Sequence, residues 1–404
     1  MNFIFISPYF PYIYYQFCER LLKNGVNVLG IGDAPYQQLP QECRTAMREY
    51  YKVDTLEDYD QVMRAVAFFT FRYGKIDWLE SNNEYWLEND AQLRTDFHIE
   101  TGIMIDGINA YKHKSCMKKY YEKADIPCAR WHMVSSLQED LAFIHKVGYP
   151  VVVKPDCGVG AYATFKINTR SELDEFYENL PDVPYIMEEY IHGMIVSYDG
   201  IVDQDGHVVF DTSHIFPDPI MNVVNEGNHL SYYTDRVPAA DVVAIGRRTL
   251  NAFQVKGRFF HLEFFRLLND KEGMGKKGDL VALEVNMRPP GGYTPEMMNY
   301  ASGVDVYQIY ADMVSKNHTD IVSKRPYYCA YASRRDGKQY QKTHEEIMSV
   351  YGEAMVMQER MPDILSQAMG NDSYAALFET EQEVHQFIAF VQRLQRAGGE
   401  ADEN

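Results

Sequence analysis

Two segments with alternating polar and apolar residues place the strongest constraint on this chain. In F-F-H-L-E-F-F, strand alternation directs Glu263 to one face, and in L-E-V-N-M-R it directs Glu284, Asn286 and Arg288 to one face. Residues 269–279 between them are rich in Gly, Lys and Asp and predict a hairpin loop. If the strands pair antiparallel, two carboxylates and an amide oxygen converge on a half-buried surface. Buried carboxylates require a compensating cation, and oxygen ligands favour Mg²⁺ (or Mn²⁺) shared with nucleotide phosphates.

For either glutamate alone, a solvated strand face with ordinary charges is an equally good interpretation. The spacing of the whole set favours the metal site, with Glu263, Glu284 and Asn286 as its ligands. His261 lies two residues before Glu263, so we expect it to orient that carboxylate or to fill a polar position in the core.

A second cluster, Y-P-V-V-V-K-P-D-C-G-V-G, ends a predicted strand at Lys154 and continues into a loop with Gly158 and Gly160. Glycines let backbone N–H groups approach phosphate oxygens closely, and the lysine supplies positive charge. The Walker A sequence G-x-x-x-x-G-K-[ST] is absent. The alternative is a glycine-rich hairpin with a lysine whose stem lies along apolar surface.

The third cluster, M-E-E-Y-I-H-G, leaves another predicted strand. Glu188, with the backbone of Glu189 and Ile191, offers amide groups that suit the edge of an adenine ring. By itself this segment is better interpreted as a strand end with solvated acids.

Charge and composition exclude several classes of function. The formal net charge of −19 argues against nonspecific binding to nucleic acid or to anionic membranes. Six scattered cysteines without a C-x-x-C pair are typical of reduced cytosolic thiols. The N-terminus lacks the features of a signal peptide, and no run of about 18 apolar residues predicts a transmembrane helix. We therefore expect a cytoplasmic protein.

The order of predicted elements indicates a multidomain α/β and α+β protein. The first ~110 residues alternate strands and helices, which predicts a parallel sheet with helices on both faces. The turn after its first strand reads S-P-Y-F-P instead of a glycine-rich nucleotide turn, so we do not expect a dinucleotide there. Single helices are predicted over 111–127 and 295–315. The expected units are a Rossmann-like domain (1–110), a nucleotide-binding subdomain (111–195), a metal and substrate subdomain (196–320), a small α+β subdomain (321–392) and a polar tail (393–404).

Together, the order and spacing of these clusters resemble the ATP-grasp superfamily, in the branch of biotin carboxylase, the large chain of carbamoyl-phosphate synthetase and the L-amino acid ligases. The resemblance runs over about residues 1–390 and includes S-N-N-E-Y-W-L-E in the first unit. It implies an ATP-grasp fold after the Rossmann-like domain. It also implies roles for individual residues: Lys114 at the α-phosphate, Lys154 as the second phosphate lysine, Gly158 and Gly160 in a loop over the β- and γ-phosphates, Glu188, Glu189 and Ile191 at the adenine, Glu263, Glu284 and Asn286 at the metal, and Arg288 at the γ-phosphoryl group or acyl phosphate.

Family chemistry implies an ATP- and Mg²⁺-dependent ligase that converts a small-molecule carboxylate to an acyl phosphate and couples it to an amine, such as an amino acid. The sequence departs from the family at Ile195, where an acid that holds the ribose is expected. It also has Arg288-Pro-Pro-Gly-Gly in place of the bicarbonate site of biotin carboxylase, which favours the amino acid ligase side. Two alternatives stay open, namely an enzyme that activates bicarbonate and a degenerate ATP-grasp protein that binds nucleotide as a regulatory subunit. The oligomeric state is also open, a homodimer included.

On the substrate side, we predict that Arg288 and the backbone of Gly291 and Gly292 face the carboxylate of the acceptor. The long polar and aromatic stretch 216–234 predicts a loop that covers the substrate, with an ordinary surface connection as the alternative.

Overall fold

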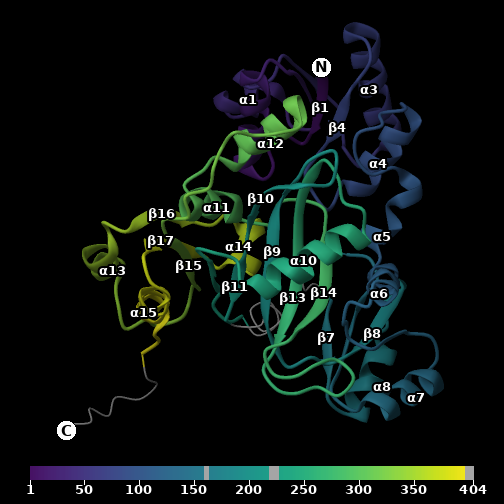
Figure 1. The fold of residues 1–404 in the computed structure, drawn as a ribbon, viewed down its shortest axis with the longest axis vertical. Helices are drawn as coiled ribbons and strands as arrows, with labels where there is room; N and C mark the ends of the chain where they lie inside the picture. The colour runs from purple at the N-terminus through teal and green to yellow at the C-terminus, as the bar shows by residue number, and fades with distance from the viewer. Residues whose placement is uncertain (159–162, 218–226, 396–404) are drawn as a thin grey trace.

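The computed structural model describes residues 1–158, 163–217 and 227–395, and its chain forms three sheets (Figure 1). The first sheet has the order β3-β2-β1-β4, and each neighbouring pair is parallel. This confirms the parallel N-terminal sheet. The elements of this part are β1 (Asn2–Ile6), α1 (Tyr15–Lys23), β2 (Asn27–Gly32), α2 (Gln41–Thr45), β3 (Glu49–Lys52), α3 (Tyr59–Tyr73), β4 (Trp78–Glu80) and α4 (Leu87–Asp96).

Both faces of this sheet are buried, as alternate residues of β1 show. Phe3 and Phe5 lie in one apolar cluster with residues of α1 and α2, whereas Ile4 and Ile6 lie in another with residues of α3. A strand with two buried faces is apolar at every position, which is why N-F-I-F-I lacks alternation.

The second sheet is antiparallel, has the order β5-β8-β6-β7, and lies at the lower right of Figure 1. Its elements, with the two helices that precede it, are α5 (Asn109–Lys112), α6 (Lys114–Lys123), β5 (Trp131–Met133), α7 (Leu137–Val147), β6 (Val151–Pro155), β7 (Phe165–Ile167), α8 (Arg170–Glu178) and β8 (Tyr185–Glu189). Ser136 and Thr169 cap α7 and α8 with their side chains, so both helices begin at N-cap residues of the favoured type.

The third sheet has nine strands in the order β14-β13-β9-β11-β12-β15-β17-β16, with β10 paired to β9. Its strands are β9 (Gly193–Val202), β10 (Val208–Thr212), β11 (His214–Phe216), β12 (Ser231–Thr234), β13 (Arg258–Leu267), β14 (Leu280–Asn286), β15 (Tyr328–Arg334), β16 (Met355–Arg360) and β17 (Asp372–Phe378). Its helices are α10 (Ala240–Ala252), α11 (Thr294–Ser302), α12 (Val306–Lys316), α13 (His344–Tyr351), α14 (Asp363–Met369) and α15 (Glu381–Gln392).

The predicted boundary between residues 320 and 321 does not separate two sheets. β15 pairs with β12 along four residues, so β15, β16 and β17 at the left of Figure 1 continue the central sheet. The element order alone suggested a small separate unit, because it does not reveal that β12 has an unpaired edge for β15. Within the described ranges, no helix is both long and apolar enough to cross a bilayer.

The single helix predicted over 111–127 is wrong at both ends. His113 has an extended backbone and forms a bridge to Cys157, so the segment divides into α5 and α6. α6 ends at Lys123, and Asp125 has a φ of 54°, which continues no helix. The break at His113 lets a new helix begin at Lys114.

The single helix predicted over 295–315 is likewise two helices. Gly303 has a φ of 65° and ends α11, and Asp305 caps α12 by accepting a hydrogen bond from the backbone N of Gln308.

The predicted loop over 216–234 is wrong at its ends, because Phe216 belongs to β11 and residues 231–234 form β12. Residues 218–226 of that stretch, and residues 396–404 of the predicted tail, lie outside the described residues.

Candidate functional site

The site is built on β13 and β14, which pair antiparallel as predicted. Glu263 lies directly opposite Glu284, and His261 directly opposite Asn286. The two glutamate side chains are 16% and 18% exposed. Directly opposed side chains in an antiparallel pair have Cβ atoms about 5 Å apart. The register of one hairpin therefore brings two partly buried carboxylates together.

Three lysines pair with glutamates beside this hairpin. Lys114 Nζ lies 3.1 Å from Glu284 Oε1. Lys154 Nζ and Lys118 Nζ each lie 3.0 Å from one oxygen of Glu188. All three lysines are buried, so Lys114 is not an ordinary exposed helix lysine.

The loop after Lys154 fixes the start of the helix that carries Lys114. The Asp156 carbonyl oxygen accepts a hydrogen bond from the backbone N of Lys114 at 2.9 Å. The Asp156 side chain accepts from the backbone N of Ser115 at 2.7 Å and also contacts the Ser115 hydroxyl. One residue thus ties the end of β6 to the first turn of α6, and so positions Lys114 relative to Lys154.

These ion pairs, together with burial, shift the pKa values of the glutamates and lysines around the cavity. Burial opposes the charge of Glu188, but the ammonium groups of Lys118 and Lys154 lower its pKa to about 2. Burial likewise opposes the charge of Glu284, and Lys114 and Lys154 hold its pKa below the usual range. For Lys114, burial lowers the pKa but Glu284 more than compensates, whereas for Lys154 burial and the neighbouring lysines leave the pKa lowered. The carboxylates and ammonium groups of this cluster therefore compensate one another.

A cavity lies between the second sheet and the central sheet at this point. Most of the predicted site residues contribute to its wall. The lining residues are Lys114, Val152, Lys154, Thr164, Glu188, Glu189, Tyr190, Ile191, Gly193, Ile195, Glu263, Phe265, Leu283, Glu284, Asn286 and Arg288. The structure therefore joins the three clusters of the sequence into one site.

Of the predicted glycines, the described ones, Gly158, Gly291 and Gly292, are not among the residues that line this cavity. The carbonyl oxygen of Gly158 accepts a hydrogen bond from Lys114 Nζ at 3.2 Å. Gly160 lies outside the described residues. Gly291 and Gly292 form the turn between Arg288 and α11, where the Gly291 carbonyl accepts from the Thr294 hydroxyl at 2.7 Å.

Arg288 contacts Glu84, a residue of the N-terminal unit. Its Nε lies 3.7 Å from Glu84 Oε2, and Lys112 Nζ lies 3.6 Å from the other oxygen of Glu84. Glu84 is the acid of S-N-N-E and follows β4 by four residues. The first unit thus takes part in the site through this side chain.

Glu188 uses its side chain for the two lysines, and Glu189 uses its side chain for Arg130 and Lys271. Any contact of this segment with the edge of an adenine ring would therefore come from its backbone.

His261 Nε2 lies 2.8 Å from Glu263 Oε1, so His261 contacts the carboxylate that it was expected to orient.

Sequence reasoning did not assign site roles to Glu84, Lys118 and Asp199. Lys118 lies four residues after Lys114 on one helix and therefore shares its face, which is a signal that was available. Asp199 contacts His261 and interrupts the apolar run of β9, and a buried acid in such a strand requires a partner.

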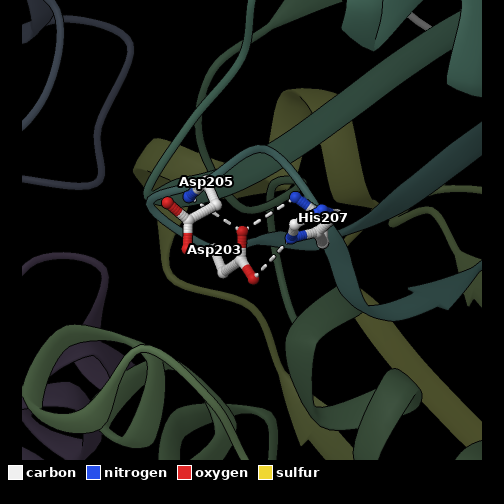
Figure 2. A group of neighbouring side chains, drawn as sticks. All are labelled: Asp203, Asp205 and His207. Carbon is white, nitrogen blue, oxygen red and sulfur yellow. Dashed lines mark hydrogen bonds and ion pairs between the residues drawn. The ribbon is translucent and has the colours of Figure 1, made fainter.

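A second group of possible metal ligands, Asp203, Asp205 and His207, lies at the turn between β9 and β10 (Figure 2). Asp203 Oδ1 accepts hydrogen bonds from the backbone N of Asp205 at 2.9 Å and of His207 at 2.8 Å. Asp205 Oδ2 accepts from Asn317. These contacts close the turn, so the group has a structural explanation.

Comparison with known proteins identifies one domain within this chain. Residues 114–292 match the family described as "ATP-grasp domain", a range that contains every predicted site residue. The L-arginine-specific L-amino acid ligase of Bacillus subtilis is 23% identical over 267 residues, which cover 64% of this chain and 62% of that protein. D-alanine–D-alanine ligase A of Clostridium perfringens is 36% identical over 100 residues, 23% of this chain and 33% of that protein. Each match therefore spans less than two thirds of the relative.

Among solved structures, an L-amino acid ligase from Bacillus licheniformis has the same fold, with a TM-score of 0.72 and 16% identity over 96% of this chain and 95% of that chain. The resemblance and the fold class inferred from the sequence are confirmed.

Glu188→Gln leaves Lys118 and Lys154 without their anion and should lower the free energy of unfolding at pH 7 by about 3 kcal/mol. The native pKa of Glu188, about 2, lies below its ordinary value of 4.5. Its stabilisation is therefore complete above pH 4.5 and is lost as the pH falls towards 2. Urea unfolding at several pH values measures this difference. The exposed Glu178→Gln is the control, and a loss no larger than in the control would contradict the assignment.

Proposed function

We propose that this chain, which contains an ATP-grasp domain, is an ATP- and Mg²⁺-dependent ligase that forms an acyl phosphate from a small-molecule carboxylate and couples it to an amine. The observation that carries the proposal is the pairing of Glu263 with Glu284 beside three buried lysines. This arrangement has acidic oxygens for a cation and ammonium groups for phosphates in one cavity. The relatives named as amino acid ligases and as D-alanine–D-alanine ligase support the same chemistry.

The proposed ligands of the metal are Glu263, Glu284 and Asn286. They fit Mg²⁺ or Mn²⁺ because all three offer oxygen, lie partly buried on adjacent strands and leave room for the oxygens of phosphates. When bound, the metal would neutralise charge that develops on the phosphates during transfer.

Nucleotide binding is assigned to the other wall of the cavity. Lys114 and Lys154 are proposed to bind phosphate oxygens, and Gly158 and Gly160 to approach them through the backbone. The backbone of Glu188, Glu189 and Ile191 is proposed to contact the adenine. Ile195, where an acid for the ribose was expected, lies in the cavity wall and supplies no hydrogen-bonding side chain.

The ion pairs of the structure lower the electrostatic cost of binding nucleotide and metal. Lys114 and Glu284 compensate each other at 3.1 Å. A phosphate at Lys114 and a cation at Glu284 would replace this pair without leaving either group uncompensated. Binding of nucleotide and metal should therefore be mutually dependent.

Arg288 is proposed to stabilise the transferred phosphoryl group or the acyl phosphate, because it lines the cavity next to Glu284 and Asn286 on the polar face of the hairpin. Gly291 and Gly292 follow it, and with Arg288 they are proposed to face the carboxylate of the acceptor. We also propose a cytoplasmic location, since all six cysteines are free thiols.

The function is tested by the release of phosphate from ATP and Mg²⁺ with a panel of amino acids, offered singly and in pairs, with and without bicarbonate. A ligase requires a carboxylate and an amine together and yields one coupled product per phosphate, detectable by mass spectrometry. Turnover that depends on bicarbonate alone would replace the proposal by an enzyme that activates bicarbonate. Tight ATP binding without turnover would replace it by a regulatory role.

Glu284→Gln keeps the shape of the side chain but removes the charge that a cation needs. We expect kcat to fall by about 100-fold or more, with an unchanged circular dichroism spectrum. Glu272→Gln, in the exposed loop between β13 and β14, should retain full activity. Wild-type turnover and Mg²⁺ dependence in Glu284→Gln would remove this residue from the site.

Lys154→Ala removes one ammonium group from the proposed phosphate site. A hydrogen bond to a charged group is worth about 1.5–3 kcal/mol, so the Kd for ATP should rise roughly 10- to 100-fold. Isothermal titration calorimetry measures it, with the exposed Lys146→Ala as the control. An unchanged Kd would show that Lys154 binds only Glu188.

A further inference from the structure

A row of buried polar side chains lies behind Glu263. Asp199 on β9 pairs with His261 on β13, and in the next row Ser197 pairs with Glu263. His261 Nε2 lies 2.8 Å from Glu263 Oε1, and its Nδ1 contacts Asp199 Oδ1. The second oxygen of Asp199 lies 2.6 Å from Nδ1 of His214. The carboxylate of Glu263 is thus the exposed end of a chain of hydrogen bonds that runs across the sheet.

The contacts specify which atoms carry hydrogen. Ionised carboxylates only accept hydrogen bonds, so the contact at 2.8 Å is a hydrogen bond that His261 Nε2 donates to Glu263 Oε1. Asp199 and His261 are 0% and 6% exposed, so solvent does not compete for either contact.

The consequence for Glu263 is that one lone pair of Oε1 is already used in a hydrogen bond to His261. Ligation through Oε2 leaves this hydrogen bond intact, whereas chelation of one cation by both oxygens competes with it. Mg²⁺ is small and octahedral and binds carboxylates well through a single oxygen, whereas Ca²⁺ accepts six to eight ligands and readily takes both oxygens of a carboxylate. Hydrogen bonds to metal ligands commonly change metal affinity 10- to 100-fold.

We propose that His261, held by Asp199, restricts Glu263 to ligation through one oxygen and thereby makes the site select Mg²⁺ over Ca²⁺. His261 and Asp199 are positioning residues in this proposal, which rests on the proposed function. It assigns a role in metal selection to two side chains that lie outside the ligand set.

Two amide substitutions separate the two contacts of His261. In His261→Gln the side-chain amide replaces Nε2 and can still donate to Glu263. In His261→Asn the amide replaces Nδ1, keeps a hydrogen bond to Asp199 and leaves Glu263 without its donor. The control is Thr212→Val, since Thr212 is buried directly opposite Asp199 in the β9–β10 pair and its hydroxyl has no hydrogen bond among the described residues.

The measurement is electron paramagnetic resonance of Mn²⁺ bound to the full chain with ADP, with displacement by Mg²⁺ or by Ca²⁺. We expect wild type, Thr212→Val and His261→Gln to prefer Mg²⁺, and the ratio of the two displacement constants to fall at least tenfold in His261→Asn. Urea unfolding verifies that each variant is folded. Thr212→Val with a wild-type ratio excludes a general effect of changes in this part of the sheet.

Three results would overturn the inference. An unchanged ratio in His261→Asn shows that the hydrogen bond does not govern selection. Equal changes in the Gln and Asn variants show that His261 acts only on the structure of the sheet. Wild-type protein that binds no Mn²⁺ with ADP contradicts both this inference and the proposed function, whereas in the first two results the proposed function stands.

Discussion

The register of β13 against β14 is the constraint on which the site depends. It places Glu263 directly opposite Glu284. Like charges at directly opposed positions destabilise a sheet unless cations lie nearby. One cation is Lys114, at the start of a helix distant in sequence. The other is His261, two residues from Glu263 on the same strand. A hairpin that would be unfavourable alone is therefore stable only when the second sheet and its helix pack against it. The same requirement keeps Lys114 and His261 polar, because apolar residues cannot replace these partners without leaving the carboxylates uncompensated.

The cavity needs all three parts of the chain. The second sheet contributes Lys154 from the end of β6, and α6 contributes Lys114 to the wall and Lys118 as a partner of Glu188. The N-terminal unit contributes Glu84, which follows β4 and contacts Arg288 of the wall. In parallel sheets, side chains at the carboxyl ends of strands meet at one edge, and Glu84 follows such an end. The N-terminal sheet thus orients an arginine of the cavity although it lacks a glycine-rich nucleotide turn.

The sequence predicts those parts of the site that depend on local periodicity. Alternation in F-F-H-L-E-F-F and L-E-V-N-M-R gives the faces of β13 and β14, and the loop between them implies antiparallel pairing, so Glu263, Glu284 and Asn286 could be placed together. Contacts between segments that are distant in sequence produce no periodic pattern from which they could be predicted. Asp156 fixes the start of α6 by accepting hydrogen bonds from the backbone of Lys114 and Ser115, and nothing in residues 111–127 alone indicates the break before it. The continuation of the central sheet through β15 depends on the edge of β12, which no periodicity reveals.

The acids around the cavity differ in how their oxygens are engaged, and this difference separates structural from functional groups. Glu188 has a lysine on each oxygen, and Glu189 has Arg130 on both and Lys271 on one. Both are buried, so they hold cations in place and have no oxygen left for a ligand. Among the described residues, Glu263 and Glu284 are each engaged through Oε1 alone and are more exposed. A dipositive ion offers a carboxylate oxygen more electrostatic stabilisation than water does, but it cannot displace two buried lysines from Glu188 without stranding their charges. This difference supports the proposed cation site at the hairpin, where both carboxylates line the cavity and each has one oxygen free of an ion pair among the described residues.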